Sequence, residues 1–151
     1  MHTDELPDLR RGGESKLLLK AETEKLIGFC MNIHSELGKG HDEIIYKDAL
    51  VVELQRAQIP FARELKYEIA CKGAILPHHY HSDFVIWDKI LFEGKATERL
   101  TDAHTKQVVN YLAVSKLELG LLVNFGGDSL EWKRVVLSRQ KPQPLAADFR
   151  L

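Results

Sequence analysis

Two carboxylates and a lysine lie close together in the segment DFVIWDKILFEGK, residues 83–95. Asp83 begins one apolar run, and Glu93 and Lys95 lie near the end of the next. The two carboxylates, with waters and a backbone carbonyl near Gly94, could bind Mg²⁺ through hard oxygen atoms. The ion would polarise a phosphate and acidify a bound water, while Lys95 stabilises negative charge on the phosphorus oxygens. The segment therefore contains the minimum set of groups for metal-dependent hydrolysis of a phosphodiester.

The three side chains meet only if the two apolar runs form a hairpin with a suitable register. Residues directly opposite one another in an antiparallel pair project to the same face of the sheet. A two-residue loop of Asp88 and Lys89 would place Asp83 opposite Gly94 and would point Glu93 to the other face. The site therefore requires a turn with an odd number of residues, or a β-bulge between the strands.

The same residues also have simpler explanations. On spacing alone, Asp83, Glu93 and Lys95 could be the solvent-facing charges of an exposed hairpin, because charged side chains lie mostly at protein surfaces. A different metal site is conceivable as well, since His79 and His81 would share a face with Asp83 in a regular strand and could bind zinc. No cysteine pair accompanies these histidines, which counts against zinc.

The rest of the sequence predicts the elements that must position the three charges. Apolar residues recur every three or four positions over 18–37, which predicts an amphipathic helix. Gly38-Lys39-Gly40 turns the chain into a second helix that ends at Ile59-Pro60. Strands are predicted over 61–71, 80–87 and 90–96, then a helix over 101–115 with Thr101 as its N-cap, and strands over 119–125 and 130–137. The order ααβββαββ predicts a mixed α/β sheet with helices on its faces.

Length and composition predict one folded domain. The chain has 151 residues, of which 44% are apolar and 28% charged, an ordinary mixture that excludes a wholly disordered or fibrous protein. We expect a flexible N-terminal arm over residues 1–17, a single domain over 18–137 and a polar C-terminal tail over 138–151.

The cellular setting follows from what the sequence lacks. No apolar run approaches the roughly 20 residues of a membrane span, and the polar start does not resemble a secretory signal. Cys30 and Cys71 suit reduced thiols better than a disulfide framework. We therefore expect a cytoplasmic protein with no membrane contact. Its formal net charge of −1 means that nucleic acid would have to be bound through a local patch or a bound cation.

Further segments on both sides of the triplet complete a longer pattern. GHDEIIY at 40–46 matches the motif GxxExxY, and YHSD at 80–83, EGK at 93–95 and LGLLVNFG at 119–126 follow in order. This order resembles the GxxExxY protein family, which belongs to the PD-(D/E)XK nuclease superfamily, over about residues 22–137. The resemblance implies a restriction-endonuclease-like mixed sheet with an αβββαβ core flanked by helices. It also implies hydrolysis of DNA or RNA that depends on Mg²⁺, with Mn²⁺ as a possible substitute.

The resemblance assigns roles to individual residues. Asp83 and Glu93 look like the metal-binding carboxylates, and Lys95 looks like the catalytic lysine. Glu43, on an early helix, resembles the additional acidic residue that such sites place near the metal. Gln107 resembles the polar residue that reaches back to the site from the helix after the third strand.

Three further residues are candidate substrate contacts: Tyr46, His81 and His104. Tyr46 lies one helical turn from Glu43 and could instead orient it by a hydrogen bond or pack beneath it. His81 stands where the family often has an arginine, so a phosphate contact could have become titratable. His104 could equally pack near the site. Gly94 departs from the apolar residue that the family commonly has, which loosens the strand.

These observations support two hypotheses of different classes. The first is a Mg²⁺-dependent nuclease that acts on DNA or RNA through a metal-activated water. The second is a catalytically silent protein of nuclease fold that binds nucleic acid or a protein partner. The joint presence of the acidic residues and the lysine favours the first. By analogy with relatives that cut duplexes, a homodimer is also expected.

Overall fold

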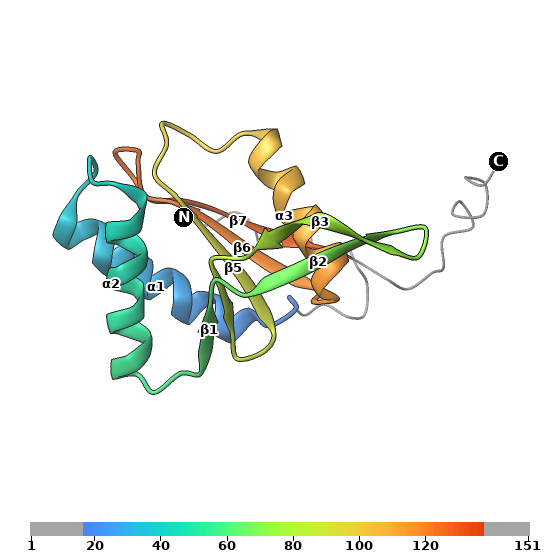
Figure 1. Cartoon of the computed structure of the whole chain (residues 1–151). Coiled ribbons are helices and arrows are strands. Elements are labelled where there is room, and N and C mark those ends of the chain that lie inside the picture. Colours follow the sequence, from blue (N-terminus) through green and yellow to red (C-terminus); the bar gives the residue numbers. More distant parts are fainter. Residues whose placement is uncertain (1–16, 138–151) are drawn as a thin grey trace.

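The computed structural model describes residues 17–137 (Figure 1). Its elements, in chain order, are α1 (Lys20–Leu37), α2 (Glu43–Arg56), β1 (Phe61–Arg63), β2 (Lys66–Cys71), β3 (Ala74–His81), β4 (Phe84–Ile86), β5 (Ile90–Lys95), α3 (Asp102–Ser115), β6 (Leu119–Asn124) and β7 (Glu131–Val136). The expected arm and tail lie outside the described residues, except for Leu17, which is buried.

A five-stranded sheet with the order β1-β4-β5-β6-β7 forms the centre of the described fold. Strands β5 and β6 run parallel, and the other neighbours run antiparallel. Helices α1 and α2 pack on one face of the sheet and α3 packs on the other (Figure 1). The predicted mixed sheet with helices on its faces is confirmed. Strand β6 is buried along its whole length, as its uniform apolar sequence predicts.

The alternation of side chains along β5 decides which helix each residue meets. Ile90 and Phe92 pack in the core beneath α1 and α2, whereas Leu91 packs with residues of α3. Because residues two apart in a strand line the same face, Glu93 and Lys95 share the face that α3 covers.

Local capping sets the ends of two helices that flank this sheet. The N–H of Gly38, which has a φ of 73°, donates to the His34 carbonyl at 2.8 Å and ends α1. At the start of α3, the Thr101 side chain accepts from the His104 N–H, and the His104 side chain accepts from the Thr101 N–H. The predicted N-cap at Thr101 is confirmed, in the form of a capping box.

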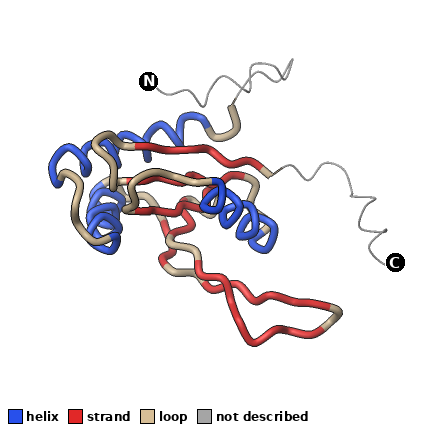
Figure 2. The backbone as a smooth tube through the Cα atoms, turned by 90° about the horizontal axis from the view of Figure 1, so that it is seen from above, coloured by secondary structure: helices blue, strands red, loops and turns tan. Residues whose placement is uncertain are grey.

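The strand predictions are wrong at two places, because part of the chain forms a separate ribbon. The predicted strand 61–71 is divided into β1 and β2, and 80–87 is divided between β3 and β4. Glu64, with a φ of 53°, turns the chain after β1, so that β2 and β3 pair only with each other and project from the body (Figure 2). Two backbone hydrogen bonds join the base of this ribbon, from Glu64 N–H to the Asp83 carbonyl and from Ser82 N–H to the Leu65 carbonyl.

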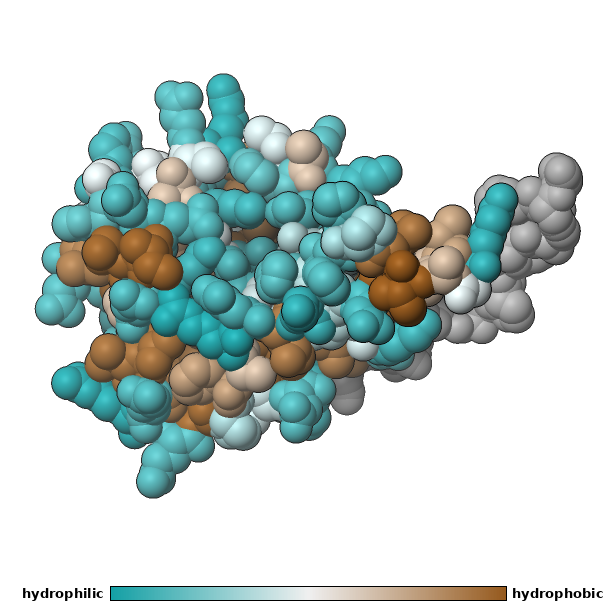
Figure 3. Space-filling view, in the orientation of Figure 1, coloured by the Kyte–Doolittle hydropathy of each residue, from teal (hydrophilic) through white to brown (hydrophobic). Residues whose placement is uncertain are grey.

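The surface view in Figure 3 shows mostly polar side chains, interrupted by apolar patches. Exposed large apolar residues of the described range include Ile44 and Ile45 on α2, and Ile75 and Leu76 on β3. No helix within residues 17–137 has both the length and the apolar character that crossing a membrane requires.

Candidate active site

The β4–β5 hairpin has the register that the predicted site requires. Ile86 pairs with Ile90, so the turn between the strands holds residues 87–89. This odd-numbered turn puts Asp83, just before β4, opposite Glu93 in the continued register. The geometric condition that the sequence set for the site is therefore met by the turn itself, without a bulge between these strands.

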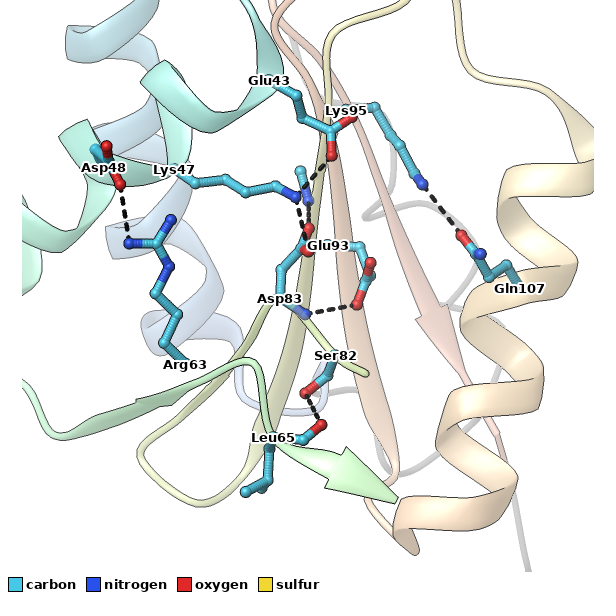
Figure 4. A network of polar contacts seen from close by, with 11 residues as sticks. Glu43, Lys47, Asp48, Arg63, Leu65, Ser82, Asp83, Glu93, Lys95 and Gln107 are labelled. Atoms are coloured by element: carbon cyan, nitrogen blue, oxygen red, sulfur yellow. Dashed lines mark hydrogen bonds and ion pairs between the residues drawn. The ribbon is translucent and has the colours of Figure 1, made fainter. Parts of the chain in front are cut away.

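Backbone hydrogen bonds hold the two carboxylates side by side. The N–H of Asp83 donates to Glu93 Oε2 at 3.0 Å, and the N–H of Gly94 donates to Asp83 Oδ2 at 2.8 Å (Figure 4). Glu93 is 3% exposed, so little water reaches it. Each carboxylate is thus fixed by the strand that carries the other, and their relative position is part of the sheet.

The carboxylate pair has too little positive charge around it. Burial is the main cause that raises the pKa of Glu93 to about 8, and the negative charge of Asp83 raises it further. The Asp83 N–H and the ammonium groups of Lys95 and Lys47 lower the pKa only in part. A cation bound to this pair would offset both the desolvation and the repulsion.

Lys47 belongs to the site although the sequence analysis did not select it. Its Nζ lies 2.6 Å from Glu43 Oε2 and 2.8 Å from Asp83 Oδ1. Burial lowers the pKa of Lys47, but the hydrogen bonds to Asp83 and Glu43 outweigh this effect and leave the pKa raised. The ammonium is therefore charged at neutral pH. The available signal in the sequence was the spacing of four residues between Glu43 and Lys47 on one helix.

Lys95 forms a hydrogen bond with Gln107, the candidate residue on α3. Its Nζ donates to Gln107 Oε1 at 3.1 Å. Figure 4 shows Glu43 entering from α2 and Gln107 from α3, with Asp83, Glu93 and Lys95 between them. The structure thus brings together all five residues that were predicted as ligands or catalytic groups.

Comparison with known proteins supports this arrangement at the level of the superfamily. The family model of the PD-(D/E)XK nuclease superfamily matches residues 20–135, most of the chain. The chain belongs to the PD-(D/E)XK nuclease superfamily. Its mixed sheet flanked by helices is consistent with a restriction-endonuclease-like fold.

A solved structure also resembles the chain in its fold. The crystal structure of SSO0001 matches with a TM-score of 0.53 and 21% sequence identity, over 87% of this chain and 64% of that one. At this identity the likeness shows the fold alone, and the chain spans less than two thirds of that structure's length. No curated protein matches the chain.

Tyr46 packs in the core beneath α2. It is 0% exposed and stacks on Phe125 with 4.7 Å between ring centroids. Its hydroxyl donates to the Gly38 carbonyl at 2.5 Å and accepts from the His41 N–H at 3.2 Å. Among the contacts of residues 17–137, the phenol holds the turn before α2 and makes no hydrogen bond to Glu43. Of the roles considered for Tyr46, its burial and stacking favour packing.

The two candidate histidines lie outside the network around Asp83. His104 is engaged in the capping box of α3, and exposed His81 pairs with Lys66 across the β2–β3 ribbon. Within residues 17–137, no group of three or more His, Cys, Asp or Glu side chains is arranged to hold a metal ion. The alternative zinc site of His79, His81 and Asp83 is therefore not assembled.

Asp83 and Glu93 nevertheless fit Mg²⁺. This ion keeps several waters and is commonly held by one or two carboxylates together with substrate phosphate. The pair offers hard oxygen atoms on adjacent strands, and the raised pKa of Glu93 marks a shortage of positive charge at the same place. The donor set and its electrostatics both suit a hard divalent cation.

Proposed function

We propose that this chain is a Mg²⁺-dependent nuclease that hydrolyses phosphodiester bonds of DNA or RNA with water as the nucleophile. The observation that carries the proposal is the pair of buried Glu93 and partly buried Asp83, tied by backbone hydrogen bonds and close to Lys95. Membership of the nuclease superfamily supports it. The motif at residues 40–46 further supports placement in the GxxExxY family within that superfamily.

Each residue has a distinct part in the proposed reaction. Asp83 and Glu93 hold the Mg²⁺, which when bound polarises the scissile phosphate and acidifies a water. Lys95 stabilises the negative charge that develops on the phosphorus oxygens. Gln107 accepts a hydrogen bond from Lys95 and so directs its ammonium. Glu43 adds negative charge at the edge of the site.

The proposed partners follow from the same chemistry. The formal net charge of the whole chain is −1, so a polyanionic substrate must be held locally, by the metal and by lysines near the site. Cutting both strands of a duplex requires a second active site, which a homodimer would supply. We place this activity in the cytoplasm.

A second candidate function is favoured by one observation. Lys47 already neutralises part of the charge on Glu43 and Asp83, as a protein that binds nucleic acid without cutting it could do. In that case the site would bind no catalytic ion, and the carboxylates would serve the fold.

Cleavage assays separate the two functions. Labelled single- and double-stranded DNA and RNA are incubated with Mg²⁺ or Mn²⁺ and with the native chain, Asp83→Asn or Lys95→Met. We expect native cleavage, and a loss of about 100-fold or more in each variant. Glu24→Gln and Lys20→Met are matched controls, because they remove the same groups from an exposed ion pair on α1. Cleavage that is absent in the native chain supports the silent binder. Cleavage that is equal in the native chain and in Asp83→Asn shows that the activity does not come from this site and overturns the proposed mechanism.

A further inference from the structure

Lys47 and Asp83 form a well-enclosed ion pair. The Lys47 and Asp83 side chains are 14% and 16% exposed, whereas the partners of the Lys20–Glu24 pair are 49% and 54% exposed. The Lys47 ammonium contacts carboxylates from two different elements, Glu43 on α2 and Asp83 at the start of β4 (Figure 4). A surface ion pair contributes little, but an enclosed cation between two carboxylates fixes their separation.

The strand beneath Lys47 leaves room for its aliphatic stem. Gly94 has no side chain, and a Cβ added there would lie 3.8 Å from Lys47 Cγ and 3.5 Å from Phe92 Cε1. A methyl group would therefore just fit, while the extra methyl groups of valine would press on the lysine stem. Two independent features therefore hold the Lys47 ammonium beside Asp83. They are the four-residue spacing from Glu43 on α2 and the absence of a side chain at Gly94 on β5.

We propose that Lys47 is a built-in cation that takes the place of a second divalent ion and limits the site to one Mg²⁺. This inference rests on the proposed function. Two-metal phosphodiesterases hold ions about 3.5–4 Å apart, which requires carboxylate oxygens on both sides of a shared ligand. Here Asp83 is the residue placed to be shared, with Glu93 on one side and Glu43 on the other. Lys47 occupies the oxygens of Glu43 and Asp83 that the second ion would need.

Lys47 is therefore a positioning residue, and Glu43 acts through it. The ammonium draws Glu43 toward Asp83 and neutralises part of the charge on both. Its removal leaves Glu43 and Asp83 without the cation that lies between them. Lys47→Met suits the test because it keeps an unbranched stem over Gly94 and removes only the charge.

The test counts bound ions by electron paramagnetic resonance of free Mn²⁺ during titration, at about pH 8.5 so that Glu93 is ionised. We expect about one Mn²⁺ per native chain and about two per Lys47→Met chain. Lys47→Arg keeps the charge, and Lys20→Met removes a lysine from an exposed pair with the same four-residue spacing; both should bind about one ion. Gly94→Val, which displaces the stem, should bind about two.

The outcomes distinguish this inference from the function on which it rests. Two ions in the native chain, or a single ion in both Lys47→Met and Gly94→Val, overturn the inference while leaving the nuclease function intact. No Mn²⁺ bound by any of the chains overturns both. The native count needs no variant, so two ions in the native chain overturn the inference even if one substitution prevents folding, which circular dichroism would reveal; Lys47→Met and Gly94→Val are independent variants, and either one that folds completes the test.

Discussion

The protonation of the Glu93 carboxyl depends on whether a metal ion is bound beside it. It is almost fully buried, and burial together with the charge of Asp83 raises its pKa to about 8. At neutral pH without a metal, most Glu93 side chains therefore carry a proton. A metal ligand must be a carboxylate, so an ion that binds here has to displace that proton.

Binding of Mg²⁺ should consequently become tighter as the pH rises. Below about pH 8 we expect the affinity to increase by up to about tenfold per pH unit, and above it to level off. Isothermal titration calorimetry in buffers of different ionisation enthalpy measures both the affinity and the proton released. Asp128, an exposed acid outside the site, supplies the control Asp128→Asn, which should retain the pH dependence. Equal affinity at pH 6 and pH 8 would contradict the assignment of Glu93 as a ligand.

At the scale of elements, the site depends on how loops set register and spacing. The turn at 87–89 puts Asp83 opposite Glu93, and Trp87 and Asp88 in it have positive φ values of 56° and 60°. At the C-terminal end of β5, the loop that leads to α3 must keep Lys95 within hydrogen-bond distance of Gln107. Buried Asn124 on β6 is the anchor of that loop.

Asn124→Ala should therefore weaken both the fold and the site. Asn124 is 0% exposed, accepts from the Thr97 N–H at 2.9 Å and donates to the Thr97 carbonyl at 2.9 Å. Its loss leaves these part-buried backbone groups without their partner and opens a cavity at a fully buried position, so we expect a destabilisation of about 2–4 kcal/mol in urea unfolding. Cleavage should also fall, because the segment between Lys95 and Gln107 loses its anchor. Exposed Asn32 gives the control Asn32→Ala, with a change within about 0.5 kcal/mol; similar losses in both variants would refute the anchoring role.

Local sequence patterns predicted the elements better than the contacts between them. Helical periodicity, the Thr101 cap and the apolar run of β6 depend on neighbouring residues, and the structure confirms them. The β2–β3 ribbon was misassigned because β3 is mostly exposed and lacks an apolar alternation, and because the sequence does not mark the break at Glu64, whose φ is positive. Lys47 was missed because its spacing from Glu43 is ordinary for a helix, whereas its second partner, Asp83, is 36 residues away. Such a contact exists only once the sheet is assembled.

At the scale of the whole molecule, the site joins the layers of the fold. Glu43 and Lys47 come from α2 on one face of the sheet, Gln107 comes from α3 on the other, and the carboxylates lie at the edge between them (Figures 1 and 4). An ion bound to the central pair is bound by the folded state and not by the unfolded chain. Metal binding should therefore stabilise the entire described fold.

Without a metal ion, the free energy of unfolding should fall as the pH rises, because Glu93 must then ionise inside the folded protein. The pKa of Glu93 is about 8 in the folded protein and about 4.5 when unfolded. A raised pKa contributes stability that is complete below about pH 4.5 and is lost as the pH rises through about 8. In EDTA, the stability of the native chain relative to Glu93→Gln should fall over this window by an amount on the order of a few kcal/mol.

Mg²⁺ should restore the free energy of unfolding that is lost at high pH. The ion binds the ionised Asp83–Glu93 pair and offsets its mutual repulsion. At pH 8, a Mg²⁺ concentration about 100 times the dissociation constant should raise the free energy of unfolding of the native chain by about 2.7 kcal/mol. Glu93→Gln, which lacks one ligand, should gain much less. Urea unfolding at pH 5 and pH 8, with and without Mg²⁺, measures all of these quantities. A native chain whose stability relative to Glu93→Gln is the same at both pH values would contradict the raised pKa of Glu93 and, with it, the proposal that this carboxylate binds the ion.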